Sequence, residues 1–370
     1  MKKIALVHDW LTGMRGGEKV LEAICEIFPE ADLYTLLYTH GSVSKIIADR
    51  KIFTSFLQKL PNIEKNYRFY LVFMPLIISQ FDLSDYDLVI SSNHCVAKGV
   101  KIGKNTLHIC YCHTPMRYIW DMYEVYFGKN SKAGLLSKLA MKILRKPLQV
   151  WDVETSKYVT CFVANSENVK ERIKRIYNRD SVVIYPPVDT DFYTLPQQPK
   201  RGNYYLVVSA FAPYKRIDIV IEAFKKLNFN LKIIGSGQQE KYIKYLAKGC
   251  KNIELLGWQS NEVIRYHYQN AKALIFPAEE DFGIVPVEAQ ACGCPVIAFR
   301  KGGALETVIE NKTGIFFDDQ TPQSIIEAVN NFENKINTFK PEVLRENAIR
   351  FSKSNFIREF KNLIKNYIDI

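Results

Sequence analysis

Short runs of β-branched and other apolar residues alternate with amphipathic segments along the whole chain. Parallel strands are joined by crossover helices, so this alternation is typical of βαβ units. It predicts an α/β fold made of Rossmann-like, doubly wound parallel sheets. The expected strands are residues 4–8, 87–91, 106–111, 158–164 and 182–185, followed by 204–209, 231–235, 252–256, 273–277, 295–299 and 314–317.

A break separates these two series of strands. Residues 185–203 contain four prolines and a polar stretch, which is typical of a linker. A chain of 370 residues is long enough for about two domains of roughly 100–200 residues each. We expect one domain over residues 1–187 and a second over residues 188–351. The apolar spacing of residues 340–370 predicts a helix, whose last part, about 352–370, packs back on the first domain.

The chain is basic, with 50 lysines and arginines against 39 acidic residues and a formal charge of +11. Such a surface attracts polyanions, anionic lipid headgroups or phosphorylated small molecules. We expect no nucleic-acid partner, because the chain has no zinc-finger spacing, RNA-binding signature or zipper. The N-terminus does not read as a secretory signal, and the most apolar run, residues 71–78, is far shorter than the roughly 20 residues of a spanning helix. We therefore expect a cytoplasmic chain.

The loop after the first expected strand contains Gly13, Gly16 and Gly17 and opens a helix. Ligands of doubly wound sheets bind beyond the carboxyl ends of the strands, where this loop lies. Its glycines let backbone N–H groups approach a ligand, and the positive end of the helix dipole attracts phosphate. A tight turn without a ligand explains the same glycines.

Lys215 and Arg216 lie between another expected strand and the helix that follows it. Arginine offers a planar fork of donors and lysine a point charge, so together they would clamp a diphosphate and offset the charge of a leaving nucleotide. A solvated pair of surface cations is the alternative.

The segment from Glu280 to Glu288 is the most informative part of the sequence. Glu280 lies in the loop after a strand, Gly283 permits a sharp turn, and Pro286 suits the first turn of a helix that carries Glu288. Two carboxylates are thus placed beside a helix N-terminus. This arrangement predicts a ligand with both sugar hydroxyls and phosphates.

At these residues the chain resembles the retaining glycosyltransferases of family 4, which have the GT-B fold and a Glu-x7-Glu motif that matches Glu280 and Glu288. The resemblance covers nearly the whole chain, and it implies two domains that face each other across a cleft. Residues 113–121 and 214–218 look most like bacterial mannosyltransferases of O-antigen and exopolysaccharide assembly. Further matching positions are residues 13–17, Asn165-Ser166, Pro186–Asp189, Gly235-Ser236-Gly237 and Gly302-Gly303.

The resemblance assigns a role to each candidate residue. Glu280 would bind hydroxyls of the transferred sugar, His113 would lie near that sugar, and Glu288 would hold the ribose. Lys215 and Arg216 would take the diphosphate; the family usually has an arginine five residues before the lysine, where this chain has Ala210. Further donor-binding positions would be Gly16, Gly17, Gly235, Gly237, Phe282, Gly283, Ile284 and Val285, and acceptor-side positions would be Arg15, Arg117 and Asp121.

The implied reaction transfers mannose from GDP-mannose to a lipid-linked glycan or other saccharide, with retention of anomeric configuration. Cations and helix ends can neutralise the diphosphate, so we expect no metal and no other cofactor. Two alternatives stay open: a GT-B epimerase or hydrolase of nucleotide sugars, and a non-catalytic nucleotide-sugar-binding scaffold.

The remaining histidines and the cysteines indicate no further site. His8, His40, His94 and His108 are scattered in the sequence, and we interpret them as satisfied polar residues. The eight cysteines form no Cys-x-x-Cys pair, so we interpret them as buried thiols.

Two segments mix apolar and basic residues in a way that suits a membrane surface. Residues 53–80 and 132–157 interleave leucine, isoleucine and phenylalanine with lysine and arginine. Such helices can rest on an anionic bilayer, and we expect peripheral contact with the inner face of the cell membrane. Helices that face the protein core explain the same spacing.

Overall fold

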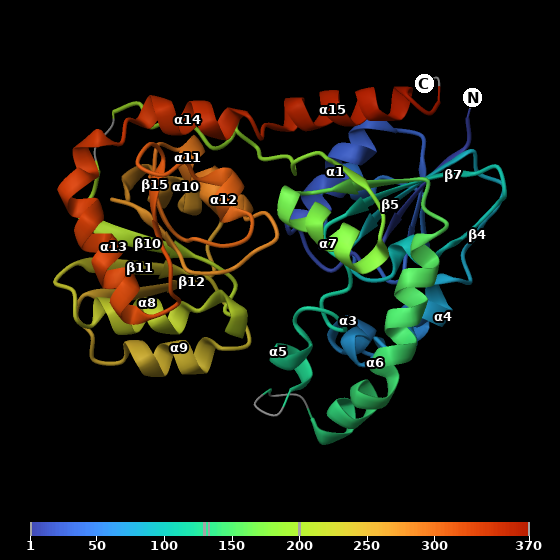
Figure 1. Cartoon of the computed structure of the whole chain (residues 1–370), viewed down its shortest axis with the longest axis horizontal. Helices are drawn as coiled ribbons and strands as arrows, with labels where there is room; N and C mark the ends of the chain where they lie inside the picture. The colour runs from blue at the N-terminus through green and yellow to red at the C-terminus, as the bar shows by residue number, and fades with distance from the viewer. Residues whose placement is uncertain (1, 129–130, 132–133, 199–200, 369–370) are drawn as a thin grey trace. The chain divides into compact units, whose positions relative to one another are not determined.

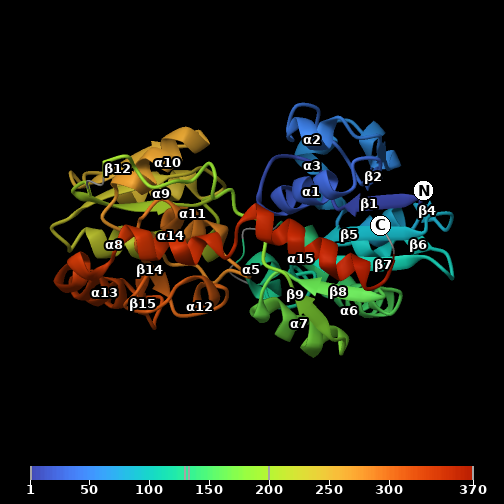
Figure 2. The ribbon, with the colours of Figure 1, turned by 90° about the horizontal axis from the view of Figure 1, so that it is seen from above.

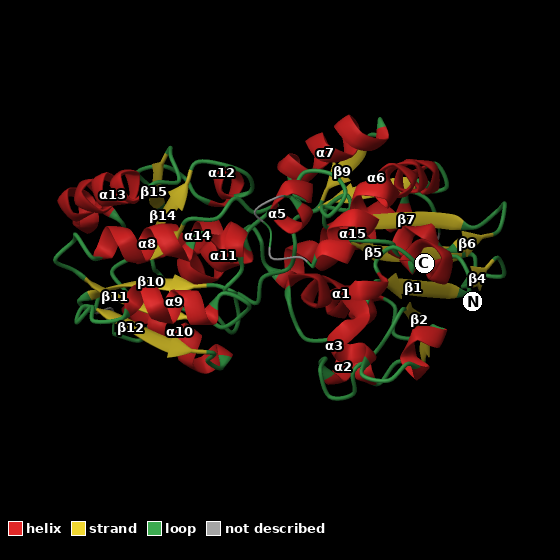
Figure 3. Cartoon of the chain, turned by 90° about the horizontal axis from the view of Figure 1, so that it is seen from below, coloured by secondary structure: helices red, strands yellow, loops and turns green. Residues whose placement is uncertain are grey.

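The computed structural model describes residues 2–128, 131, 134–198 and 201–368; residues 132–133 and 369–370 of the expected helical segments lie outside them. The chain forms two compact units. Unit 1 comprises residues 1–187 and 356–370, and unit 2 comprises residues 188–355. Figure 3 shows the strands of each unit flanked by helices.

The described part of unit 1 contains a parallel sheet with the strand order β3-β2-β1-β5-β7-β8-β9. β5 is buried along its whole length, as expected for a central parallel strand that is covered on both faces. A small separate ladder pairs β4 with β6. The strands are β1 (Ile4–His8), β2 (Asp32–Thr35), β3 (Ile52–Thr54), β4 (Asp82–Leu83), β5 (Leu88–Asn93), β6 (Lys101–Ile102), β7 (Leu107–Cys112), β8 (Cys161–Ala164) and β9 (Ser181–Val183).

Helices cover the two faces of this sheet, so neighbouring residues of β1 enter different cores: Leu6 packs with α1 and α15, and Val7 packs with α4 and α6. α15 lies on the same face as α1 (Figures 1 and 2) and places the rings of Phe356 and Phe360 5.8 and 6.5 Å from the ring of Tyr111 in β7. The helices are α1 (Gly16–Ile27), α2 (Lys45–Ala48), α3 (Ile63–Asn66), α4 (Met74–Ile78), α5 (Tyr123–Phe127), α6 (Leu135–Ser156), α7 (Glu167–Tyr177) and α15 (Lys353–Lys365), with 3₁₀ turns η1 (Phe56–Lys59), η2 (Tyr67–Tyr70) and η3 (Ala97–Gly99).

Unit 2 has a parallel sheet with the order β12-β11-β10-β13-β14-β15 among its described residues. α8 and α13 cover one face and share a large apolar core with the sheet. The strands are β10 (Tyr204–Val208), β11 (Asn230–Ile234), β12 (Ile253–Gly257), β13 (Leu274–Phe276), β14 (Val296–Phe299) and β15 (Gly314–Phe317). The helices are α8 (Ile217–Phe224), α9 (Glu240–Ala247), α10 (Asn261–Asn270), α11 (Ile284–Ala291), α12 (Ala304–Thr307), α13 (Pro322–Lys335) and α14 (Pro341–Ile349), with 3₁₀ turns η4 (Pro213–Lys215) and η5 (Ile336–Thr338).

The expected α/β class with parallel sheets is confirmed, but the single helix expected over residues 340–370 is wrong. The helix breaks between α14 and α15, because backbone groups there bond to the linker instead of to a helical turn. The Val188 N–H donates to the carbonyl of Phe351 at 2.9 Å, and the Lys353 N–H donates to the carbonyl of Val188 at 3.1 Å. The sequence reading also omitted the short strands β2 and β3.

Candidate active site

Three adjacent strands of unit 1 end in a cluster of imidazoles. His8 is the last residue of β1, Ser92 lies near the end of β5, and His113 directly follows β7. The Ser92 Oγ lies 3.0 Å from Nδ1 of His8 and 2.8 Å from Nε2 of His113. His8 and His94, interpreted from the sequence as scattered polar residues with satisfied partners, do have partners in Ser92 and Asp9, and the strand order β1-β5-β7 gathers them beside the candidate His113.

The buried carboxylate of Asp9 anchors the loop that follows β5. It accepts the N–H groups of four successive residues, 94–97, at 2.6–3.0 Å, and it contacts Nδ1 of His94 at 2.9 Å. Burial alone raises the pKa of Asp9, but the charge and hydrogen bonds of His94 outweigh it and leave the pKa below its usual range. Asp9 therefore stays ionised and ties the β5 loop to the end of β1.

His113 is held through its backbone as well as through its ring. Its N–H donates to the carbonyl of Asn93 at 2.9 Å, and its carbonyl accepts from Nδ2 of Asn165 at 3.0 Å. Burial, together with the neighbouring His94 and His8, lowers the pKa of His113 to about 3. The imidazole is neutral at physiological pH, so it can give or take a hydrogen bond without carrying charge.

The expected glycine loop lies directly against these imidazoles. α1 begins at Gly16, and the Arg15 N–H before it donates to Oε2 of Glu18 at 3.0 Å. A Cβ on Gly17 would stand 3.5 Å from the His8 ring and 3.6 Å from Nε2 of His113. The first N–H groups of α1, which have no partner within the helix, thus begin beside the imidazole cluster.

In unit 2, the side chains of Lys215 and Glu280 contact each other across the carboxyl ends of the paired strands β10 and β13. Both are largely shielded, with 13% and 21% of the side chain exposed. Arg216 has a left-handed backbone, with φ of +51°, and its Nε lies 3.2 Å from Oδ1 of Asp218. The two cations expected to act as one clamp therefore have different acidic partners.

Gly302 and Gly303 hold the turn after Glu280 in place. Gly283, with φ of +84°, precedes α11, as the sharp turn requires. The Gly303 N–H donates to the carbonyl of Glu280 at 2.9 Å. A Cβ on Gly302 would come within 2.4 Å of that same carbonyl oxygen, so only glycine lets the two loops approach this closely.

The remaining donor-side residues have distinct surroundings. Glu288 is buried on α11 and accepts the hydroxyl of Tyr268 at 3.3 Å. Ile284 and Val285 form the first turn of that helix. The ring of Phe282 is buried, with its centroid 5.4 Å from the Phe351 ring. The ring belongs to the core, and only its backbone is left for a ligand.

Gly235 and Gly237 shape the loop next to Ala210. Their φ angles are +146° and +152°. A Cβ on Gly235 would come within 1.8 Å of the Ser209 carbonyl oxygen, and one on Gly237 within 2.9 Å of the Phe211 backbone. These glycines therefore let the loops after β10 and β11 pack together, and Ala210 is exposed at this junction.

Asp121, an acceptor-side candidate in the loop after His113, forms ion pairs with two arginines. Asp121 contacts Arg175 at 2.7 Å and Arg172 at 3.4 Å, both from α7. Nη1 of Arg117 lies 4.0 Å from the sulfur of Met122. Because Asp121 forms ion pairs with α7, its position is fixed by this unit.

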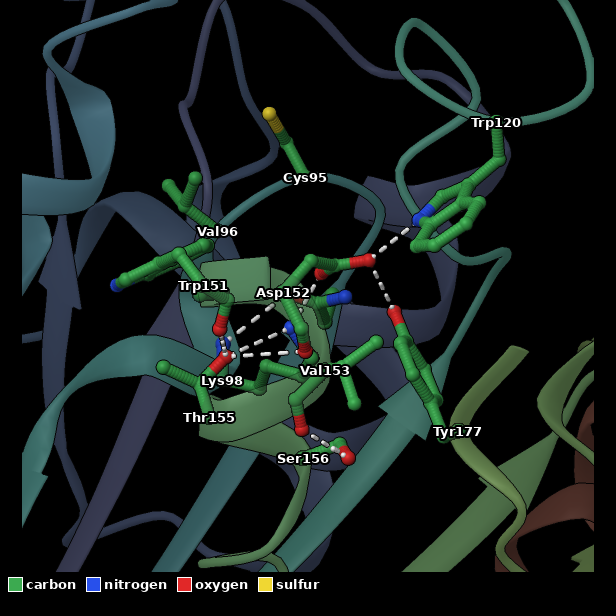
Figure 4. A network of polar contacts seen from close by, with 12 residues as sticks. Cys95, Val96, Lys98, Trp120, Trp151, Asp152, Val153, Thr155, Ser156 and Tyr177 are labelled. Carbon is green, nitrogen blue, oxygen red and sulfur yellow. Dashed lines mark hydrogen bonds and ion pairs between the residues drawn. The ribbon is translucent and has the colours of Figure 1, made fainter. Parts of the chain in front are cut away.

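A buried network that the sequence reading did not identify holds the end of the same loop (Figure 4). The Nζ of Lys98 lies 2.5 Å from Oδ1 of Asp152, and neither side chain is exposed. The other oxygen of Asp152 accepts Nε1–H of Trp120 at 2.8 Å and the hydroxyl of Tyr177 at 2.9 Å. One carboxylate thus joins η3, α6, α7 and the loop that begins at His113.

No group of three or more histidine, cysteine or acidic side chains could hold a metal ion within the described part of the chain. All eight cysteines lie in that part and are free thiols. In the same residues, no helix has both the length and the apolar character to cross a membrane.

Two family models match successive parts of the chain. Residues 14–192 match Glycosyltransferase Family 4, and residues 195–351 match Glycosyl transferases group 1. An uncharacterized glycosyltransferase of Methanocaldococcus jannaschii is 33% identical over 195 residues, which span 51% of this chain and 53% of that protein. The alpha-1,3/1,6-mannosyltransferase ALG2 of Candida glabrata is 24% identical, with 98% of this chain and 92% of that one covered.

Solved structures agree with this fold. HepE of Anabaena, crystallised with UDP and glucose, superposes with a TM-score of 0.71 at 17% identity, and the match covers 99% of this chain and all of that one. The lipopolysaccharide outer core galactosyltransferase WaaB gives a TM-score of 0.66 at 17% identity, with 99% of this chain covered. The two family models identify the chain as a glycosyltransferase of family 4, and these structures show that it has the GT-B fold.

Proposed function

We propose that this glycosyltransferase transfers mannose from GDP-mannose to a lipid-linked glycan or other saccharide, with retention of anomeric configuration. The observation that carries the proposal is the shielded contact of Lys215 with Glu280 at the carboxyl edge of the unit 2 sheet, next to the loop that opens α11. A cation, a carboxylate and a helix N-terminus suit a ligand that combines phosphates with hydroxyls. The family membership and the mannosyltransferase names among the relatives support it.

In this proposal each group acts on a different part of one donor. Lys215 offsets the negative charge that builds up on the leaving diphosphate, and Arg216 adds to it once freed from Asp218. Glu280 orients the sugar through its hydroxyls, and Glu288 holds the ribose. An oxygen of the donor phosphate accepts the proton of the acceptor hydroxyl on the same face of the sugar, so the reaction needs no protein nucleophile.

The choice of donor can be tested by ligand-induced thermal stabilisation. At about 100 times its Kd, a ligand that binds only the folded state adds about 2.7 kcal/mol, which raises Tm by about 5–10 °C in a unit of this size. We expect GDP-mannose to give the largest shift in a panel with GDP-glucose, UDP-glucose and UDP-N-acetylglucosamine. A larger shift with a UDP-sugar would contradict the mannosyl assignment, and donor breakdown without an acceptor would favour a hydrolase.

We also propose that unit 1 rests on an anionic bilayer through α6 and the segment from η1 to α4. These elements turn part of their apolar surface inward, where Met74, Met141 and Leu148 share one core. Their other faces are exposed: Leu135 and Leu136 of α6 are 85% and 83% accessible. The exposed set is Phe56, Phe69, Phe73, Leu76, Leu135, Leu136, Leu139 and Ile143. Lysines at 138, 142 and 146 accompany these side chains on α6 and suit anionic headgroups.

A pair of leucine variants tests this surface. Because burying one exposed leucine is worth about 1.5–3 kcal/mol, we expect Leu136→Gln with Leu139→Gln to weaken binding to phosphatidylglycerol vesicles at least about tenfold in a flotation assay. Leu305→Gln is the control, since Leu305 is also an exposed leucine, 53% accessible, but lies on α12 of unit 2, outside the proposed surface. The proposed surface would be contradicted if the double variant and the control bound phosphatidylglycerol vesicles equally well. It would also be contradicted if the wild type bound neutral phosphatidylcholine vesicles as tightly as phosphatidylglycerol vesicles.

A further inference from the structure

Four polar groups of unit 1 form a continuous buried chain that ends at His113. Oε1 of Glu18, from α1, lies 3.9 Å from Nε2 of His8. Nδ1 of His8 lies 3.0 Å from the hydroxyl oxygen of Ser92, which lies 2.8 Å from Nε2 of His113. Nε2 of His8 is fully buried and makes no hydrogen bond within the described residues, and the carboxylate of Glu18 lies next to it.

The single hydroxyl proton of Ser92 links the proton positions of His8 and His113. A serine hydroxyl has one proton to donate, and here it stands between two ring nitrogens. If both hydrogen bonds form, the hydroxyl donates to one ring and accepts an N–H from the other. The proton positions on His8 and His113 therefore depend on each other.

Glu18 determines which group donates and which accepts in this series of contacts. Burial raises the pKa of Glu18, but the neighbouring imidazole of His8 outweighs burial and leaves the pKa below its usual value. The group is thus an ionised carboxylate at neutral pH, and a carboxylate can only accept. A lone pair on Nε2 of His8 would face this negative charge, whereas an N–H is attracted to it.

We infer that Glu18, His8 and Ser92 are positioning residues that keep the proton of His113 on Nε2, which leaves Nδ1 as a hydrogen-bond acceptor for the ligand. With N–H on Nε2 of His8, its Nδ1 accepts the Ser92 hydroxyl, and the Ser92 oxygen then accepts Nε2–H of His113. Nδ1 of His113 makes no hydrogen bond to any described residue.

This inference rests on the proposed function and sharpens the part that His113 plays in it. An acceptor nitrogen can accept a hydrogen bond from a sugar hydroxyl, and its lone pair is compatible with positive charge on the sugar in the transition state. An N–H at the same position would oppose that charge.

The test compares Ser92→Ala with Ser91→Ala. Ser91 is the adjacent residue of the same strand, is equally buried, and bonds Nε2 of His108 at 2.9 Å, away from the cluster. Imidazole nitrogen NMR of the full-length, histidine-labelled chain reports the tautomer of His113. We expect Nε2–H in the wild type and in Ser91→Ala, and a mixture of tautomers in Ser92→Ala. We also expect Ser92→Ala to lower kcat at least about tenfold with KM for GDP-mannose changed less than about threefold.

Two results would overturn the inference: a proton on Nδ1 of His113 in the wild type at neutral pH, or an unchanged tautomer and kcat in Ser92→Ala. Glu18→Gln is the second variant, because it removes the charge that sets the direction without touching Ser92, and we expect mixed tautomers there too. The NMR result needs no turnover, so it stands even if GDP-mannose is not the donor. A wild type that shows the expected tautomer but no transfer contradicts the proposed function alone.

Discussion

Lys215→Ala and Glu280→Ala are each expected to lower turnover at least about a hundredfold without unfolding unit 2. Lys215 would no longer offset the charge of the leaving diphosphate, and Glu280 would no longer fix the sugar, so both losses fall on the transition state. Steady-state transfer assays give the rate, and circular dichroism confirms the fold. Wild-type turnover in either variant would remove the residue from the site.

The contact between these two side chains requires a control, since breaking an ion pair can harm any protein. Lys272 and Glu333 form a matched pair in the same unit, at 2.7 Å and with 16% and 26% of their side chains exposed. Lys272→Met is expected to keep turnover within about twofold of the wild type. The double variant Lys215→Met with Glu280→Gln separates the two roles: a purely structural pair would recover activity when both charges are removed, whereas ligand-binding groups would not.

The sequence predicts the fold well where strands are buried on both faces. β5 begins with three apolar residues and β14 is wholly apolar, and both strands were expected within one or two residues. β2 and β3 have only four and three residues and mix polar with apolar side chains, so their pattern does not differ from that of a loop. The break before α15 depends on backbone bonds to the distant Val188, which no local pattern reveals.

Candidate site residues are predictable from sequence when one short segment carries them. Gly283 turns the chain between Glu280 and Glu288 as its spacing indicates, and Lys215 contacts Glu280 because β10 and β13 are neighbours. The cluster of His8, Ser92 and His113 is different, since these residues are separated by 84 and 21 positions and meet only through the strand order. The sequence also did not predict the partner of Arg216, which has a left-handed backbone and a side chain that contacts Asp218.

Asp152→Ala is expected to destabilise unit 1 by about 3–5 kcal/mol, the range for breaking a buried ion pair. The change leaves the fully buried ammonium of Lys98 without its counter-charge, and it removes the acceptor of Trp120 and Tyr177. Urea unfolding followed by tryptophan fluorescence measures the loss. Because Trp120 lies in the loop that begins at His113, we expect this variant to lower turnover as well, even under conditions where it is folded.

We expect the loss of stability in Asp152→Ala to come from the burial of the unpaired Lys98 charge. Two further variants, one in unit 1 and one in unit 2, test this explanation. Lys98→Met with Asp152→Leu removes both buried charges and is expected to recover most of the lost stability, since no ion is left uncompensated. Lys244→Ala breaks the exposed pair with Glu240, whose side chains are 65% and 43% accessible, and is expected to cost at most about 0.5 kcal/mol. A cost below about 1 kcal/mol for Asp152→Ala would mean that water or another group reaches Lys98, and the network would then not hold the loop.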